Sequence, residues 1–196
     1  MPTAPATART DPVERARLRL VEVFLAEGFA HLGVGDLASR AECSRTTLYR
    51  IAGSKEQVVA EVVRSYFRQA AERIDDRIEE TVGHQGAASD RLEAYLLGVA
   101  AELSRASERF ARDLAADPVA SQVYRANTDH AAARVAALLR DGVRDASMRP
   151  VDAEFVGAVV AQVMAAIQRG DIAGVAHAEA YRKLADLVVR GVGSRA

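Results

Sequence analysis

Apolar residues recur every three or four positions along most of the chain, which is the spacing of one face of an α-helix. The longest stripe consists of Val59, Val62, Val63, Tyr66, Phe67, Ala70, Ile74 and Ile78. Alternating β-branched runs bounded by turns, the pattern of half-buried strands, do not occur in the sequence. The pattern predicts an all-α protein of about nine helices. They are expected over residues 13–27, 34–40, 45–51, 55–80, 90–106, 107–117, 118–145, 153–169 and 176–190.

Glycine and proline residues set the ends of these helices. No proline occurs between Pro12 and Pro118, so long helices are permitted throughout that stretch. Gly28 is expected to end the first helix, and residues 83–89 form a loop. Residues 1–12 are rich in Ala, Pro and Thr, a composition typical of a disordered arm.

Residues 34–55 combine two short helices, a tight break and a longer helix, which is the spacing of a helix-turn-helix unit. In such a unit the second helix enters the major groove of DNA with its polar side, while its apolar side holds it on the protein. Leu48 and Ile51 fit the apolar side. The residues expected to face DNA are Ser44, Arg45, Thr46, Thr47, Tyr49 and Arg50. Arginine pairs with guanine through two hydrogen bonds, and threonine contacts the thymine methyl group.

Lys55 follows a capping serine at the start of the helix expected over 55–80. Its ammonium group adds to the positive end of the helix dipole, an arrangement that favours a bound phosphate. A lysine in the first turn is unfavourable for the helix itself, so an external anion gives it a role. For each of these residues alone, a solvated surface is the better interpretation, and only the whole group indicates DNA binding.

Four groups of residues between positions 13 and 67 form a dense pattern. They are Phe24, Gly28 and Phe29; Val34, Asp36, Leu37 and Ala38; Ser44, Thr47, Leu48 and Tyr49; and Ser54, Lys55 and Glu56. On these residues the segment resembles the N-terminal domain of TetR-family transcriptional regulators. The resemblance adds Gly33 and Val34 to the DNA-contacting residues. It implies a homodimer, usually a repressor, with a helix-turn-helix DNA-binding domain at 13–53 and a ligand-sensing and dimerisation domain at 54–196.

Three positions depart from the family pattern. Gly33 stands where a Ser or Thr usually caps the second helix, so a hydroxyl and a phosphate contact are missing. Glu42 replaces the usual turn glycine, which strains a left-handed backbone and brings a carboxylate toward DNA. Ala52 replaces the aromatic residue that closes the recognition helix, so Ile51 is expected to repack the core beneath it.

The helix expected over 153–169 is apolar on all sides between Phe155 and Ile167, except at Gln162. Such a helix is buried on more than one side, which favours a second subunit over a monomer with a central core helix. The eighth and ninth helices are therefore expected to form a four-helix dimer interface. Its residues are Gly157, Ala158, Ala161, Ala165, Ala180, Leu184, Leu187 and Val188. A dimer of this kind reads half-sites about 34–36 Å apart, so the operator should be palindromic.

The resemblance also implies an effector pocket inside the body, between the fourth and eighth helices. Candidate lining residues are Tyr66, Phe67, Tyr95, Phe110, Tyr124, His130, Met148, Phe155 and Met164. Each of them is also typical of an ordinary core. The mostly apolar set favours a largely apolar effector.

Charge sharpens this interpretation. The formal net charge of the 196 residues is -1. Residues 1–60 carry eight basic and seven acidic side chains, so DNA affinity must come from a few positioned charges. We therefore expect binding that depends strongly on salt and on dimerisation. The sequence contains neither an apolar run long enough to span a membrane nor a secretory leader, which predicts a cytoplasmic protein without a membrane partner.

Two other classes of function compete with this interpretation. Enzymatic activity is disfavoured because the sequence has no glycine-rich phosphate loop and no nucleophile motif, and its four histidines lack metal-ligand spacing. We expect no catalytic residue, no metal and no cofactor. Cys43 is expected to act as a small apolar residue. A helical protein that binds small molecules or partners, with weakened DNA binding, stays open because of Gly33 and Glu42.

Overall fold

The computed structural model describes residues 11–83, 85–172 and 174–193. Within these ranges it contains nine helices: α1 (Pro12–Glu27), α2 (Val34–Arg40), α3 (Arg45–Ile51), α4 (Lys55–Thr81), α5 (Ala88–Leu103), α6 (Glu108–Ala116), α7 (Pro118–Arg144), α8 (Ala153–Arg169) and α9 (His177–Val192). The only extended pairing among the described residues is an isolated bridge between Met148 and Gly193. The all-α prediction is confirmed. The arm predicted for 1–12 lies outside the described residues, except for Asp11 and Pro12.

Helix ends differ from expectation where the capping group comes from another part of the chain. Helix α5 begins at Ala88, two residues before the expected start, although Ala87 offers no side-chain cap. The Asp145 carboxylate accepts the Ala88 backbone N–H at 3.0 Å, and the Ser147 hydroxyl accepts that of Ser89 at 3.2 Å. Residues after α7 therefore cap α5, which local sequence patterns cannot reveal.

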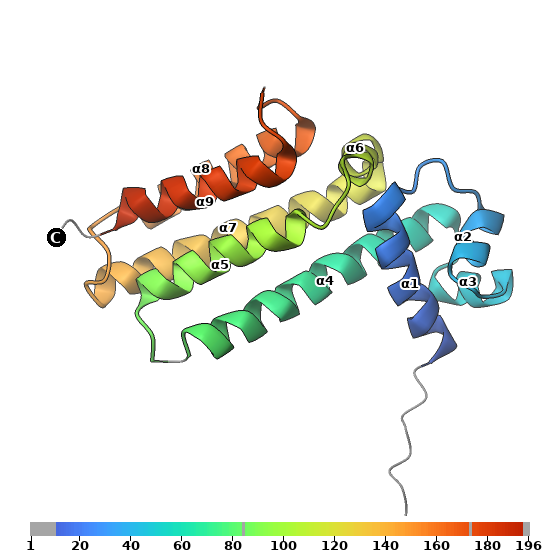
Figure 1. The fold of residues 1–196 in the computed structure, drawn as a ribbon, viewed down its shortest axis with the longest axis horizontal. Helices are drawn as coiled ribbons and strands as arrows, with labels where there is room; N and C mark the ends of the chain where they lie inside the picture. Colours follow the sequence, from blue (N-terminus) through green and yellow to red (C-terminus); the bar gives the residue numbers. More distant parts are fainter. Residues whose placement is uncertain (1–10, 84, 173, 194–196) are drawn as a thin grey trace, which may run out of the picture.

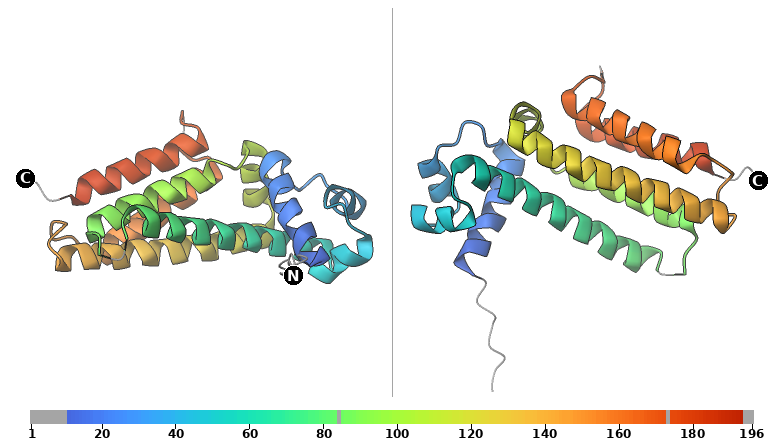
Figure 2. Two further views of the ribbon diagram at one scale, coloured as in Figure 1. Left: turned by 60° about the horizontal axis from the view of Figure 1, so that its bottom comes forward. Right: turned by 180° about the vertical axis from the view of Figure 1, so that it is seen from behind.

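The helices form a small head and a layered body (Figure 1). Helices α1 to α3 make the head, and α4 runs from the head along one side of the body. Helices α5 and α7 form the middle layer, and α8 and α9 cover the side away from α4 (Figure 2). Helix α6 packs against α1, α7 and α8, so it lies at the junction of head and body.

Two hydrophobic clusters divide the interior. The first joins α1 to α3 with the first half of α4, with Phe110 and Leu114 of α6, and with the start of α7. The second joins the far half of α4 with α5, α7, α8 and α9. Helices α4 and α7 contribute to both clusters, and a shift of α4 in the body moves a wall of the head. In the part of the chain that the structure describes, no helix combines the length and apolarity needed to cross a bilayer.

Candidate nucleic-acid interface and ligand pocket

Short polar side chains define where α2 and α3 begin. The Asp36 carboxylate accepts the Gly33 backbone N–H at 2.8 Å, although Gly33 has no side chain with which to cap α2. The Ser44 hydroxyl accepts the Thr47 backbone N–H at 3.0 Å and thereby caps α3. Leu48 is fully buried, which turns one side of α3 toward α1 and leaves the opposite side open.

The turn between α2 and α3 keeps the left-handed backbone, with Glu42 at a φ of 49°. This conformation costs a non-glycine residue on the order of 1 kcal/mol. The Glu42 carboxylate accepts a hydrogen bond from the Arg19 guanidinium of α1 at 2.5 Å. The expected repulsion between Glu42 and DNA is therefore reduced, because a cation of the head accompanies the carboxylate.

The core beneath the end of α3 is filled without an aromatic side chain. Ile51 and Ala52 are both half-buried against the first cluster, at the position where the family pattern has an aromatic residue. Cys43 packs against the same cluster, and burial raises the pKa of its thiol. The uncharged thiol acts there as a small apolar group.

The open side of α3 carries cationic and polar groups. Arg45, Thr46 and Arg50 are exposed, and the Tyr49 side chain is 46% exposed. Neither arginine forms an ion pair with any residue that the structure describes. The Arg45 guanidinium lies beside the backbone of Gly35, where an added Cβ would be 3.3 Å from it. These groups are therefore free to contact a polyanion.

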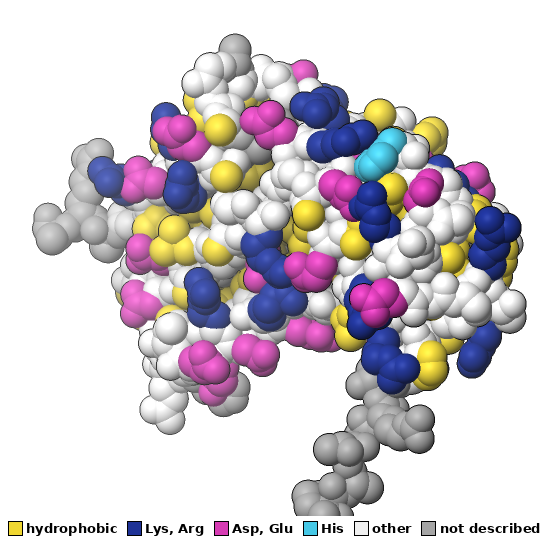
Figure 3. All heavy atoms as spheres, turned by 45° about the vertical axis from the view of Figure 1, so that its right-hand side comes forward, with side chains coloured by type: hydrophobic (Ala, Val, Ile, Leu, Met, Phe, Trp, Pro, Cys, Tyr) yellow, Lys and Arg dark blue, Asp and Glu magenta, His cyan; other side chains and the backbone are white. Residues whose placement is uncertain are grey.

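Lys55 lies in the first turn of α4 and is half-buried. The Ser54 hydroxyl caps this helix by accepting the Gln57 backbone N–H at 3.3 Å, and it donates to the Glu56 carboxylate at 2.9 Å. The Glu56 backbone N–H, the Ser54 hydroxyl and nearby Lys55 lower the pKa of Glu56. The ammonium group thus already has an acidic neighbour. Over the surface seen in Figure 3, basic and acidic side chains are interspersed.

Helix α6 is tied to the loop between α1 and α2. The Asp113 carboxylate accepts the backbone N–H groups of Phe29 at 2.6 Å and Ala30 at 2.9 Å. A Cβ at Gly28, whose φ is 75°, would collide with this carboxylate, so the close approach requires glycine. The Ser107 backbone N–H donates to a carbonyl of α1 at 2.8 Å. These bonds link the body to the head.

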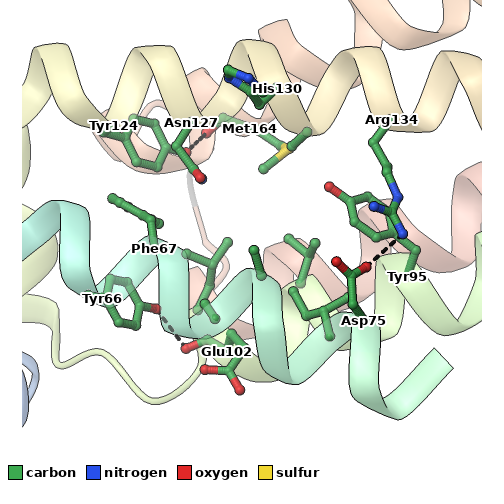
Figure 4. Close-up of a pocket in the computed structure, with 16 residues that line it drawn as sticks. Tyr66, Phe67, Asp75, Tyr95, Glu102, Tyr124, Asn127, His130, Arg134 and Met164 are labelled. Atoms are coloured by element: carbon green, nitrogen blue, oxygen red, sulfur yellow. Dashed lines mark hydrogen bonds and ion pairs between the residues drawn. The ribbon is translucent and has the colours of Figure 1, made fainter. Parts of the chain in front are cut away.

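A cavity of about 220 Å³ opens between α4, α5 and α7 (Figure 4). Its walls are mostly apolar and aromatic. It is lined by Tyr66, Phe67, Ala70, Ala71, Ile74, Asp75, Tyr95, Val99, Glu102, Leu103, Tyr124, Asn127, His130, Ala131, Arg134 and Met164. The cavity lies beside the middle of α4, the helix whose first half packs against the head.

The tyrosines of the pocket differ in what their hydroxyls do. Tyr66 donates to the Glu102 carbonyl at 2.9 Å, and the Tyr124 and Tyr181 hydroxyls are 3.0 Å apart. Burial raises the pKa of all three, so their hydroxyls stay protonated at neutral pH. Burial also raises the pKa of Tyr95 to about 12. The pocket therefore presents neutral aromatic rings.

Two arginines that do not line the cavity balance the charge of the Glu102 carboxylate. Arg73 donates two hydrogen bonds to the carboxylate, at 2.9 and 2.6 Å, and Arg105 donates one at 3.0 Å. Partial burial raises the pKa of Glu102, but the hydrogen bonds and charges of the two arginines outweigh it, so the net shift is downward. Glu102 consequently adds little free negative charge to the cavity.

Six of the nine residues expected around an effector line this cavity: Tyr66, Phe67, Tyr95, Tyr124, His130 and Met164. Three do not. Phe110 lies in the first cluster with its ring against those of Tyr66 and Phe29. Met148 packs on Gly142 beyond the end of α7, and the Phe155 side chain is 66% exposed on α8. The structure places these three side chains away from this cavity, because helix period alone does not say which neighbouring helix a face meets.

The geometry of the head has a counterpart in known proteins. The family model described as "Bacterial regulatory proteins, tetR family" matches residues 20–62, which run from α1 into α4. Over these residues the chain is similar to the TetR family. The match covers the helix-turn-helix part of the chain, and the model describes regulatory proteins.

Solved structures extend the TetR likeness to the whole fold. The E. coli regulator NemR in its reduced form has a TM-score of 0.72 at 16% identity, covering 95% of this chain and 100% of NemR. A TetR regulator from Haloarcula marismortui has 0.71 at 18%, covering 94% and 99%. A transcriptional regulator from Saccharomonospora viridis in complex with choline has 0.68 at 16%, covering 93% and 98%. No curated protein sequence matches the chain.

The TetR-like body has a long apolar groove between α8 and α9. Four of its large apolar side chains are substantially exposed: Phe155 at 66%, Val159 at 42%, Ile172 at 39% and Leu187 at 70%. Its floor contains Ala180, Leu184 and Val188, all buried and all among the expected interface residues. The exposed part of the groove is therefore formed by large residues.

The small residues of α8 are distributed differently from expectation. Gly157 is buried against α7, where an added Cβ would be 3.1 Å from the Ala132 carbonyl oxygen. Gly157 therefore packs within the protomer and does not lie on the exposed face of α8 that was expected to meet a second subunit. Ala158 is exposed, whereas Ala161 and Ala165 are half-buried.

Several residues at these sites are not predicted by the sequence. Asp75, Asn127 and Arg134 line the cavity, and Asp113 ties α6 to the head. The available signal was spacing, because positions 124, 127, 131 and 134 share one face of α7. Charged residues at such positions pass for solvated surface unless the opposing helix is known. Within the described ranges, no group of three or more His, Cys, Asp or Glu side chains could hold a metal ion; His84 lies outside these ranges.

Proposed function

We propose that the protein is a homodimeric, ligand-responsive repressor that binds a palindromic operator in the cytoplasm. The observation that carries the proposal is the open side of α3, where Arg45, Tyr49 and Arg50 are exposed and the arginines lack an acidic partner. In this proposal, α3 enters the major groove and Arg45 and Arg50 contact bases or phosphates. Residues 13–53 form the DNA-binding domain and 54–196 the sensing and dimerisation domain.

The remaining DNA contacts are assigned by their position around α3. Thr46 is exposed and free to contact a base edge or a phosphate, whereas the Ser44 and Thr47 hydroxyls share a hydrogen bond of 2.9 Å. Gly33 and Val34 lie at the start of α2 and are assigned to the DNA backbone by that position, although the Gly33 N–H already donates to Asp36. Lys55 offers its ammonium to a phosphate.

The groove between α8 and α9 supports the dimer in this proposal. Its exposed large apolar side chains form the kind of contiguous patch that monomers rarely expose and that marks an interaction site. A second copy of the chain would cover the groove, and two recognition helices would then read half-sites in successive major grooves.

The link between pocket and DNA runs along α4 and α6. A small molecule in the cavity touches α4, whose first turn carries Lys55, and α5, which leads into α6 and its Asp113 contact. Repression is relieved if the ligand binds better to a state in which the two heads are spread apart. The choline complex of the Saccharomonospora regulator supports a small-molecule occupant for the body.

The direct experiment is a gel shift with the DNA upstream of the gene for this protein. We expect binding by the unmodified chain and its loss in Tyr49→Ala combined with Lys55→Ala, with the helical circular dichroism intact. Arg112→Ala, an exposed arginine of α6, is the matched control and should bind as the unmodified chain does. Unchanged binding by the double variant would refute the assigned interface. Absence of binding by the unmodified chain would instead favour a helical ligand-binding protein whose DNA binding is weakened.

A further inference from the structure

A guanidinium group of the chain occupies a cation site at the edge of the cavity. Arg134 of α7 donates to the Asp75 carboxylate of α4 at 2.6 Å, and its guanidinium carbon is 5.5 Å from the centre of the Tyr95 ring of α5. All three side chains line the cavity and meet at one end of it (Figure 4). A carboxylate and an aromatic face are the two groups that bind organic cations in proteins.

The parts of this site differ in how firmly they are held. Tyr95 is 9% exposed and fixed in the second hydrophobic cluster, and Asp75 has a short side chain on a long helix. Arg134 has a long, flexible side chain that is 45% exposed, and its partner carboxylate is 51% exposed. Ion pairs this exposed are weak, so Arg134 can turn into solvent while the carboxylate and the ring stay in place.

The remaining walls suit an apolar body attached to the cation. Phe67, Ile74, Val99 and Met164 contribute apolar surface between the two ends of the cavity. The second carboxylate, Glu102, is already held by Arg73 and Arg105. Once Arg134 turns away, Asp75 is therefore the uncompensated charge of the cavity, and that charge is negative.

Resting on the proposed function, in which this cavity is the effector site, we propose that the effector is an organic cation with an apolar body. Its ammonium group, protonated or quaternary, displaces the Arg134 guanidinium and takes its place between Asp75 and the Tyr95 ring. Displacement breaks the ion pair between α4 and α7, which connects the helix leading to the head with the middle of the body. An anionic effector would instead pair with Arg134 and meet both the Asp75 charge and the negative face of the Tyr95 ring.

The test is isothermal calorimetry on the full chain without DNA, with three probes of equal chain length: hexyltrimethylammonium, hexan-1-ol and hexanoate. We expect hexyltrimethylammonium to bind most tightly. Arg134→Ala should tighten its binding roughly tenfold because the internal competitor is gone, and Asp75→Asn should weaken it roughly tenfold. Arg140→Ala is the matched control, because Arg140 also lies on α7 in an exposed ion pair, with Glu154, and does not line the cavity.

The opposite results would overturn the proposal. They are preferential binding of hexanoate that is lost in Arg134→Ala, equal binding of the alcohol and the cation, or weaker cation binding in Arg134→Ala. Arg134→Gln keeps most of the side chain and replaces Arg134→Ala if that variant melts at a lower temperature. The readout does not involve DNA, so failure of operator binding would refute the proposed function without changing this result.

Discussion

The open side of α3 and the groove of α8 and α9 are both exposed, but their chemistry is opposite. Around α3 the exposed groups are Arg45, Tyr49 and Arg50, whereas the groove exposes Phe155 and Leu187. Neither surface is stabilised within one protomer, since the cations lack acidic partners and the apolar side chains face water. One chain therefore presents two incomplete surfaces that need different partners, a polyanion at one end and an apolar protein surface at the other.

The largest expected effect comes from breaking the apolar surface. Leu187→Glu buries a carboxylate in the proposed subunit contact, and we expect it to weaken dimerisation by about 2–4 kcal/mol. Sedimentation should then detect monomers, and operator affinity should fall with dimerisation. Leu97→Glu is the control, because Leu97 of α5 is 47% exposed and lies outside the groove. A Leu187→Glu dimer as stable as the unmodified one would exclude this groove from the interface.

A smaller effect is expected at α6, where the head meets the body. Asp113→Ala leaves the backbone N–H groups of Phe29 and Ala30 without their acceptor, which should lower the free energy of unfolding by about 1–3 kcal/mol. Urea unfolding measures this change, with Asp129→Ala, an exposed position of α7, as the control. Equal stability of the two variants would mean that α6 is not bound to the head in solution.

The smallest expected effect is a pH dependence at the pocket wall. The folded-state pKa of Glu102 is lowered, so its carboxylate stabilises the fold above its ordinary pKa of 4.5, and this contribution is lost as the pH falls through the lower folded value. Glu102→Gln should cost about 1 kcal/mol at pH 7, and the difference from the unmodified chain should shrink below pH 4.5. Denaturant unfolding across this range measures it, with Glu93→Gln as an exposed control. A difference that persists unchanged in acid would contradict the ionic origin.

The sequence predicts the head far better than the body, for a physical reason. The hydroxyls of Ser44 and Ser54 cap their helices by accepting backbone N–H groups only three residues further along the chain. Local pattern therefore identifies both the helices and the open side of α3. The pocket depends on which faces of distant helices meet. Asp75 and Arg134 are 59 positions apart, and nothing near either residue reveals the other. Gly157 likewise fits a subunit contact by size alone, and only the position of α7 assigns it to the protomer interior.

The central claim is that α3 reads DNA with a few positioned charges. The most direct measurement is operator affinity by fluorescence anisotropy at several salt concentrations, for the unmodified chain, Arg45→Ala and Arg112→Ala. We expect Arg45→Ala to lose about 1–3 kcal/mol of specific affinity if the arginine contacts a base. If it contacts a phosphate, the salt slope should fall by about 0.9. Arg112→Ala should change neither quantity. Equal affinity and equal salt slope for all three proteins would contradict the account.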